Sequence, residues 1–575
     1  MERRTFLKST GALSAGSFLG AFNARAVPAS WTMPSAPHRM AGMPPADTRP
    51  LETESNDLTP YTGPWSDTEL RHLLRRAMFG VPPAQFQAAK ALGSMSAVVS
   101  KLLEASDLTK VPLPPKPATY VDEFLTRVNG DTVGNNNKQR LDAMRVQEII
   151  NWWFGLMAQE NLSIREKMTL MWTNHFVTGS QAVQYAGYMY QYLSTCRQYS
   201  LGNLKDFVYA ISIDPAMLVY LNGNQNYVRN GKSYVNENYA RELMELFTLG
   251  LLDLHVGTPN YGQPNYTETD IQNSARALTG WQPTTTAPFV GQLNAALHDT
   301  TSKTFLGQTG NFALQDILNI IFEQGTPAGY TSAYSLSQTI YTNFVYYNPN
   351  PSVIDAMAQV MLANNFEIAP VLNALLTSAH FYDANIIGAQ LKSPAEYAGS
   401  LVREFGLTYP AFDPTDPPIK STDGNGLNTY TDTNPTLSLI TATIMGTSQG
   451  QPLLNPPNVK GWPGGHNWIS TGTFQGRENY STNILNNLYN NTKQSLVFNA
   501  DAYASQIAND TSLTPEVLSK TLEDTSLAFT LGPLESGDLN TDIQGTYKEP
   551  NYQYNTVGVK SFALYLASLP EFQLL

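Results

Sequence analysis

The sequence predicts a mainly α-helical protein, with one large multi-helix domain and long irregular loops. Apolar residues recur with the helical period of 3.6 along most of the chain. Several of these periodic segments begin with residues typical of helix caps. Alternating strand patterns are scarce, and no internal repeat of fixed period is visible. At 575 residues, the chain is long enough to bury a large core.

Capping residues support several of the expected helices. Ser66 is the expected N-cap of the first helix. Ser163-x-x-Glu166 and Thr267-x-x-Asp270 match the capping box, in which each of the two side chains bonds the other residue's backbone N–H. In chain order, we expect helices over residues 66–80, 83–105, 137–160, 163–179, 236–250, 267–280, 353–366, 369–381 and 393–407.

The N-terminus has the pattern of an export signal. The letters "ERRTFLK" precede a weakly apolar Gly/Ala/Ser-rich stretch that ends in a small-residue site at 24–26. This resembles a twin-arginine signal, and the alternative is an ordinary secretory signal with two chance arginines. We expect residues 1–26 to be removed, 27–64 to form a Pro/Ser/Thr-rich linker and 65–575 to form the domain. No other stretch reaches 18 apolar residues, so we expect a periplasmic or extracellular protein that does not span the membrane.

The amino-acid composition favours some classes of binding partner and argues against others. Only 14% of the residues are charged, and thirty tyrosines supply much of the polar surface, which suits uncharged, hydroxyl-rich partners such as glycans. The net charge of −12 argues against a nucleic-acid partner. Cys196 is the single cysteine, so no intramolecular disulfide can form. A protein exported in the folded state does not need one.

The stretch "SYVNENYARELMELFTLG" concentrates polar residues on one expected helix, with Asn236 as its N-cap. Glu237, Arg241 and Glu245 are spaced i, i+4 and i+8, which allows a solvated ladder of ion pairs. Glu242 instead lies beside the apolar stripe, close to the edge of the core. A carboxylate there needs a partner or a shifted pKa, so the stretch can also be the wall of an active site.

Other candidates are scattered along the chain. His175 ends a strongly apolar helix, where it is either a buried structural residue or a ligand. His298 and Asp299 lie in a long stretch, 281–312, that is expected to be irregular, as is 408–436. The loop "NPPNVKGWPGGHNWIS" holds two tryptophans that can stack on sugar rings or fill a gap between helices.

Several kinds of site have no matching motif. The chain lacks His-Glu-x-x-His, paired cysteines, Gly-x-Ser-x-Gly and a phosphate-binding glycine loop. Seven histidines supply few ligands for a histidine-rich metal site. We therefore expect neither a metal nor another cofactor.

Six segments together resemble a bacterial family called domain of unknown function 1800. They are "MWTNHF", "VNENYARELMELFTLG", "YTETDIQNSARALTGW", "LHDTTSKTFLG", "LLNPPNVKGWPGG" and "ALYLASLPEFQLL". The resemblance runs from about residue 65 to the C-terminus and implies an exported protein without an agreed activity. The family pattern has histidines where this chain has Thr173 and Phe247. If those histidines bind a metal elsewhere in the family, this chain has lost that capability.

Three functions remain open. The first is a hydrolase of an extracellular polymer such as a glycan, with Glu242 as the acid and Asp299 or Glu237 as the base or nucleophile. The second is a non-catalytic surface or matrix binding protein, and the third is a metal- or cofactor-dependent enzyme. The catalytic candidates are Glu242, Glu237, Asp299, His175 and His298; the substrate-binding candidates are Arg241, Arg276, Asn174, Asn238, Trp281, Trp462 and Trp468.

The candidate site makes one structural prediction. We expect the helix over 236–250 to pack against the helix over 163–178, with Glu242 and His175 largely buried and facing shared polar partners.

Overall fold

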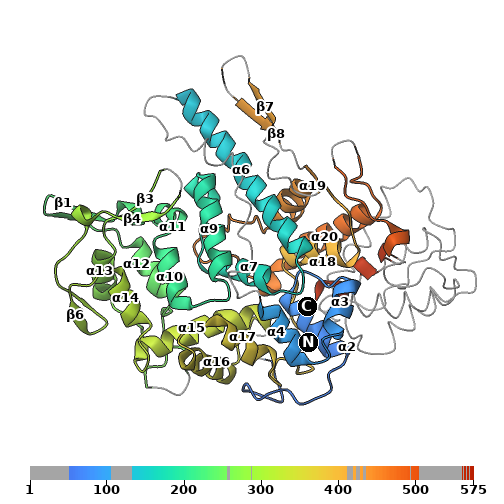
Figure 1. The fold of residues 1–575 in the computed structure, drawn as a ribbon, viewed down its shortest axis with the longest axis horizontal. Helices are drawn as coiled ribbons and strands as arrows, with labels where there is room; N and C mark the ends of the chain where they lie inside the picture. The colour runs from blue at the N-terminus through green and yellow to red at the C-terminus, as the bar shows by residue number, and fades with distance from the viewer. Residues whose placement is uncertain are drawn as a thin grey trace, which may run out of the picture.

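Helices dominate the computed structural model, and the predicted mainly α fold is confirmed (Figure 1). In the described part of the chain, the strands form only small antiparallel pairs. The structure describes residues 51–104, 132–255, 259–285, 288–410, 419–422, 426, 428–431, 435–491, 494–503, 560, 563–564, 566–568 and 570–575. The predicted signal, 1–26, lies outside these residues.

Three short helices begin the described part of the chain. They are α2 (Asp67–Ala77), α3 (Pro83–Lys90) and α4 (Met95–Leu103). The predicted N-cap Ser66 is confirmed, and it forms a capping box with Glu69. Gly80 has a φ of +106°, and a Cβ there would lie 2.8 Å from the Cα of Ser400. Only glycine allows this close approach of α2's end to the later helix α18 (Pro394–Glu404).

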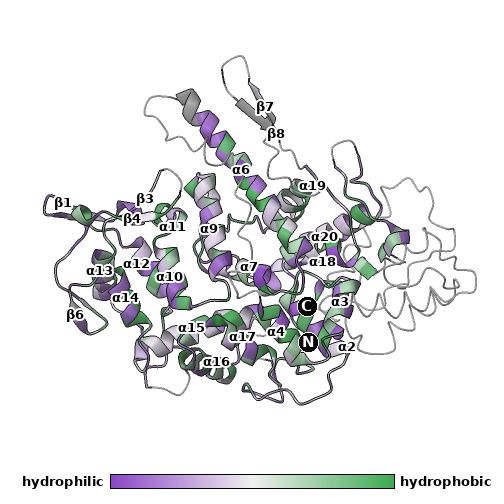
Figure 2. Cartoon of the chain, viewed as in Figure 1, coloured by the Kyte–Doolittle hydropathy of each residue, from purple (hydrophilic) through white to green (hydrophobic). Residues whose placement is uncertain are grey.

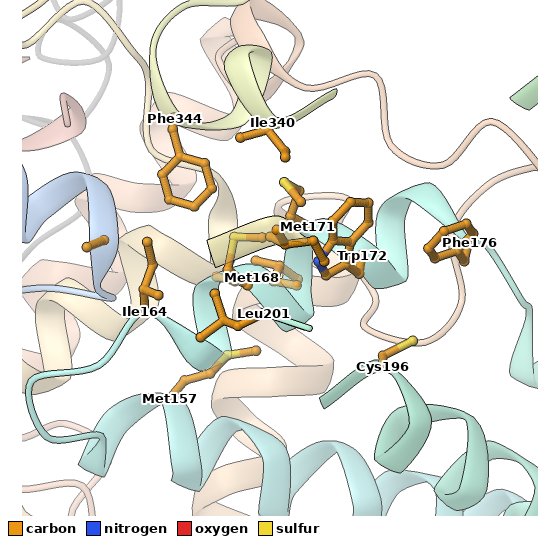
Figure 3. Close-up of a cluster of buried hydrophobic side chains, with 14 of the residues drawn as sticks. Met157, Ile164, Met168, Met171, Trp172, Phe176, Cys196, Leu201, Ile340 and Phe344 are labelled. Carbon is orange, nitrogen blue, oxygen red and sulfur yellow. The ribbon is translucent and has the colours of Figure 1, made fainter. Parts of the chain in front are cut away.

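Helix α7 (Arg165–His175) lies near the centre of the molecule and is buried along most of its length. It packs against α6 (Thr132–Gln159), α9 (Ala186–Tyr199) and α15 (Pro327–Phe344). Figure 3 shows its apolar side chains Met168, Met171 and Trp172 among residues of other elements, such as Met157 and Ile340. Polar and apolar residues alternate along many helices of the ribbon, as expected for helices with one buried face (Figure 2).

The predicted capping box at the start of α7 is wrong. The N-cap is Ile164, which makes no side-chain cap bond. Glu166 turns into the core, where its carboxylate accepts hydrogen bonds from Arg197 at 2.6 Å and from the Trp153 indole at 3.0 Å. A buried guanidinium needs a carboxylate partner. The N–H groups at this helix end bond other oxygens instead, the Ser163 hydroxyl at 3.1 Å and the Glu160 carboxyl at 3.2 Å.

The other described helices cover the remaining faces of the core. The predicted capping box of α13, made by Thr267 and Asp270, is confirmed. The helices are α8 (Ser180–Val183), α10 (Leu204–Ser212), α11 (Pro215–Tyr220), α12 (Asn238–Glu242), α13 (Glu268–Ala277), α14 (Leu314–Ile321), α16 (Pro351–Ala363), α17 (Ile368–Leu376), α19 (Pro435–Ser438) and α20 (Thr471–Leu485). Two π-helices are η3 (Leu243–Phe247) and η5 (Leu439–Ser448), and the 3-10 helices are η2 (Gly223–Gln225), η4 (Ala295–Leu297), η6 (Gly465–Trp468) and η7 (Pro570–Gln573).

The expected helix over 236–250 is two elements, α12 and the π-helix η3. Glu237, not Asn236, occupies the N-cap position, while the Asn236 side chain accepts from the Asn238 N–H at 3.0 Å. Gly250 has a φ of +79°, and its N–H bonds the Met244 carbonyl at 2.9 Å, which closes the end.

The two stretches expected to be irregular contain short hairpins. In 281–312, β3 (Trp281–Pro283) pairs with β4 (Gly291–Leu293), and β5 (Lys303–Phe305) pairs with β6 (Gln308–Gly310). In 408–436, β7 (Ile419–Thr422) pairs with β8 (Asn428–Thr431). A fourth pair joins β1 (Tyr227–Arg229) to β2 (Lys232–Tyr234).

Residues 51–64, within the predicted linker, lie along the domain. The Tyr61 N–H donates to the Thr377 carbonyl at 2.9 Å, and the Ala379 N–H donates to the Thr59 carbonyl at 2.7 Å. The rest of the predicted linker, 27–50, lies outside the described residues. None of the helices that the structure describes is long and apolar enough to cross a bilayer.

Candidate functional site

A pocket of about 350 Å³ lies where α7, α15 and α18 meet the segment 462–468, which includes the 3-10 helix η6. We call it the central pocket. Both buried and half-buried residues line it. It is lined by Lys167, Leu170, Met171, Asn174, His175, Thr339, Thr342, Asn343, Phe344, Tyr347, Gln390, Leu391, Ser393, Glu396, Gln451, Trp462, Pro463, Gly464, Gly465 and Trp468.

A buried ion pair between Lys167 of α7 and Glu396 of α18 lines the pocket. Glu396 also accepts from the Ser393 N–H at 2.6 Å, as part of the capping box of α18. Burial opposes ionisation of this carboxyl, but the Lys167 ammonium and the Ser393 hydrogen bonds lower the pKa of Glu396 below its usual value. The pair is therefore ionised but has no net charge.

Two amide side chains beside the ion pair are held in place by the protein. Arg76 donates to the Gln390 carbonyl oxygen, and the Gln390 amide donates to the Thr342 backbone carbonyl at 2.6 Å. The Gln451 side-chain oxygen accepts from the Ala395 N–H at 2.9 Å. The wall of the pocket is thus polar and preorganised.

Asn174 and Trp462, two lining residues from distant parts of the chain, bond each other twice. The Trp462 N–H donates to the Asn174 side-chain oxygen at 2.7 Å, and the Asn174 amide donates to the Trp462 carbonyl at 3.3 Å. Gly461, with a φ of +76°, allows this approach, because a Cβ there would lie 2.2 Å from the Asn174 side-chain oxygen. We call the two hydrogen bonds between Asn174 and Trp462 the clasp.

Both tryptophans of this loop are buried rather than displayed on the surface. Trp462 is 4% exposed and Trp468 is 8% exposed, and both line the pocket. The indole Nε1–H of Trp462 is buried and has no hydrogen-bond partner among the described residues. A buried donor without an acceptor is costly, so this N–H is a group of the pocket lining that lacks a partner among the described residues.

His175 joins α7 to the π-helix η3. Its Nε2 bonds the Phe247 carbonyl at 3.2 Å, and because a carbonyl only accepts, the proton is on Nε2. Burial lowers the pKa of His175 to about 4, against the effect of this hydrogen bond, so the ring is neutral at pH 7. The Phe176 and Phe247 rings also meet, with centroids 5.5 Å apart. The predicted packing of these two segments is confirmed.

Glu242 does not share polar partners with His175. It is half-buried outside the central pocket, and its charged neighbours are Glu245, Lys460 and Arg241. Burial, with repulsion from Glu245, raises the pKa of Glu242. The prediction for Glu242 is therefore met only in part. Its side chain lies at the edge of the core, but its neighbours are not those of His175.

The remaining acidic candidates belong to two separate ion-pair clusters. Arg241 pairs with Glu237 at 3.5 Å and with Glu268 of α13 at 2.9 Å, on the exposed side of α12. Asp299 accepts from Arg276 at 2.8 Å. Burial opposes the shift, but hydrogen bonds from Arg276 and Thr301 lower the pKa of Asp299 to about 2.

The other candidates lie away from the central pocket. His298 bonds the Thr279 carbonyl at 2.9 Å, Asn238 is exposed on α12, and Trp281 is half-buried in β3. Of the candidates predicted from the sequence, the pocket brings together Asn174, His175, Trp462 and Trp468. Among the residues that the structure describes, no three His, Cys, Asp or Glu side chains are placed to hold a metal ion.

Sequence reasoning missed the ion pair and the amides of the pocket. Glu396 follows Ser393 by three residues and therefore matches a helix cap. Lys167 was the available signal, since it precedes the apolar residues Met168, Leu170 and Met171, and a lysine buried among such residues needs a partner. Gln390 and Gln451 carry no signal of their own in the sequence.

Comparison with protein families matches residues 72–574 to a family described as Protein of unknown function (DUF1800). No curated protein and no solved structure matches the chain.

Proposed function

The chain belongs to the family Protein of unknown function (DUF1800), and from the geometry of its central pocket we propose that it binds a neutral, hydroxyl-rich ligand. The ligand we propose is a sugar unit of an extracellular glycan. The volume of about 350 Å³ is at the lower end of the range for small-molecule pockets, which suits one small unit.

The unpaired indole N–H of Trp462 carries this proposal. Trp462 shares the pocket lining with a neutralised ion pair and held amides, so the lining contains donors and acceptors without net charge. Sugar hydroxyls both donate and accept hydrogen bonds, and their C–H faces pack on aromatic rings such as those of Trp468 and Tyr347. An anionic ligand would meet the Glu396 carboxylate, which is already paired.

Binding is better supported than hydrolysis. A glycoside hydrolase uses two carboxyl groups on either side of the bond that breaks. Glu396 is the one carboxylate among the described lining residues, and it is ion-paired with Lys167. Glu242, Glu237 and Asp299 are not among the lining residues.

The test is calorimetric titration of the mature protein with dextran, glucomannan and pullulan, with anionic alginate as the control. We expect a neutral polysaccharide to bind and no reducing ends to be released. Trp462→Phe keeps a ring but removes the indole donor, and it should weaken binding by about 2- to 12-fold, the value of one neutral hydrogen bond. Release of reducing ends that Glu242→Gln abolishes would favour the hydrolase instead.

We also propose that the protein is exported by the twin-arginine route. The observation is the "RRTFLK" pattern together with a single buried cysteine, Cys196, which suits folding before export. Replacing Arg3 and Arg4 by lysine should retain the protein in the cytoplasm, detected by fractionation and immunoblotting. Unchanged export of the double-lysine variant would contradict this proposal.

A further inference from the structure

We propose that the ligand is a polymer segment that extends from the central pocket into a second cavity beside it. This inference rests on the proposed function and names its ligand more closely, as an oligosaccharide of several units instead of a single sugar. We call the second cavity, of about 500 Å³, the lateral groove. Its polar lining includes Gln181, Tyr220 and Asn455, and its other lining residues are glycines, prolines and an alanine.

Two segments of the chain contribute neighbouring residues to both cavities. Gly450 lines the groove and the next residue, Gln451, lines the pocket, so only one segment of chain separates them. Consecutive Cα atoms are about 3.8 Å apart. On the other wall, His175 lines the pocket and Gly179, four residues later, lines the groove. On this proposal, a ligand of several units passes over these two segments of chain from the pocket to the groove.

A backbone hydrogen bond joins the two segments that contribute to both cavities, 175–182 and 450–457. The Ser180 N–H donates to the Leu454 carbonyl at 2.9 Å. Leu454 has a φ of +57°, which is uncommon for a leucine and persists only where the surrounding structure imposes it. The same turn, closed by the Asn455 N–H and the Pro452 carbonyl at 3.1 Å, positions Asn455 at the groove. The groove is thus a fixed surface rather than a gap between mobile loops.

The chemistry of the groove matches that of the pocket. Tyr220 supplies an aromatic ring, and Gln181 and Asn455 supply amides, as Trp468, Gln390 and Asn174 do in the pocket. Burial, together with the nearby Glu242 carboxylate, raises the pKa of Tyr220, so its hydroxyl keeps its proton and can donate. Gly179 leaves room beside this ring, since a Cβ there would lie 3.1 Å from it.

The test compares ligands of one to eight units, prepared from dextran, glucomannan and pullulan, against two sets of variants. The groove variant, Tyr220→Ala with Gln181→Ala, changes a half-buried and an exposed side chain. It should weaken binding of the longest ligand by about tenfold and leave the shortest ligand unchanged. Trp462→Phe, in the pocket, should weaken both by the same factor.

Each result has a separate meaning. The inference is supported if the affinity rises with ligand length in the wild type but does not rise with length in the groove variant. Equal affinity for short and long ligands overturns it but leaves binding in the central pocket intact. A wild-type protein that binds none of the saccharides overturns both proposals. Unchanged thermal unfolding of the groove variant shows that its effect is local.

Discussion

Replacement of Glu396 by glutamine should destabilise the protein strongly, although the two side chains have nearly the same shape. One carboxylate oxygen of Glu396 accepts from Lys167, and the other accepts from the Ser393 N–H. A glutamine has a single oxygen and can satisfy only one of these donors. Its NH₂ group then faces either the Lys167 ammonium or the Ser393 N–H, and neither can accept a hydrogen bond.

The magnitude follows from the burial of the pair. The Lys167 side chain is 5% exposed, so water cannot replace the lost carboxylate. Breaking a buried ion pair by removing one partner costs about 3–5 kcal/mol. Lys167→Met combined with Glu396→Gln removes the unpaired ammonium, and it should be at least about 1 kcal/mol more stable than Glu396→Gln alone.

The assay is urea unfolding of the mature protein, followed by tryptophan fluorescence, for both single variants and the double variant. Glu268→Gln is the matched control, because this carboxylate also pairs with a basic side chain, Arg241, but is 67% exposed. The control should change the urea midpoint little, since exposed ion pairs contribute little to stability. The same midpoint shift for Glu396→Gln as for the control would refute the argument from burial.

Three further predictions concern other buried positions. Burial raises the pKa of Asp214 to about 7, so the stability that its proton provides is full below about pH 4 and lost as the pH rises through 7. Asp214→Asn preserves the helix cap, and in urea unfolding its stability relative to wild type should increase from pH 5 to pH 8. An equal difference at both pH values would contradict this. Gly461→Ala should lower the melting temperature and alter tryptophan fluorescence through the clasp, whereas Gly464→Ala, with a similar φ of +67° but open space around its Cβ, should have a much smaller effect. Thr173→His with Phe247→His should bind zinc or nickel while the unmodified protein carries no stoichiometric transition metal, as measured by elemental analysis after dialysis; a full equivalent of metal in the unmodified protein would refute the idea of a lost site.

Local signals predicted much of the secondary structure. The capping residues of α2 and α13 act through neighbours three positions away in the sequence, so Ser66 and Thr267 could be recognised without the fold. Glu166 has the same spacing from Ser163, but its partners are Arg197 and Trp153, which a capping pattern does not reveal. A local pattern therefore fails where a distant buried group competes for the same side chain.

The sequence also predicted part of the candidate site. Asn174 and His175 are predicted because they end an apolar helix, and the two tryptophans because they lie in a loop rich in proline and glycine; the structure places all four around one pocket. Glu242 is predicted because it lies beside the apolar stripe of its helix, and Asp299 because it follows His298 in a long loop. The partners of these two carboxyl groups are close in the sequence or on neighbouring helices away from the pocket. The sequence alone therefore does not separate the residues that line the pocket from the carboxyl groups that lie outside it.

By itself, the sequence determined that this protein is mainly helical, belongs to a family recognisable along most of its length, and has an N-terminal pattern typical of export. These properties depend on periodicity, caps and short motifs, which act over a few residues. Only the tertiary structure decided that Lys167 meets Glu396 across 229 positions and that Asn174 clasps Trp462 across 288. Such contacts depend on how whole helices pack, because a buried charged or amide group needs a hydrogen-bond partner, and the fold decides which partner lies near it.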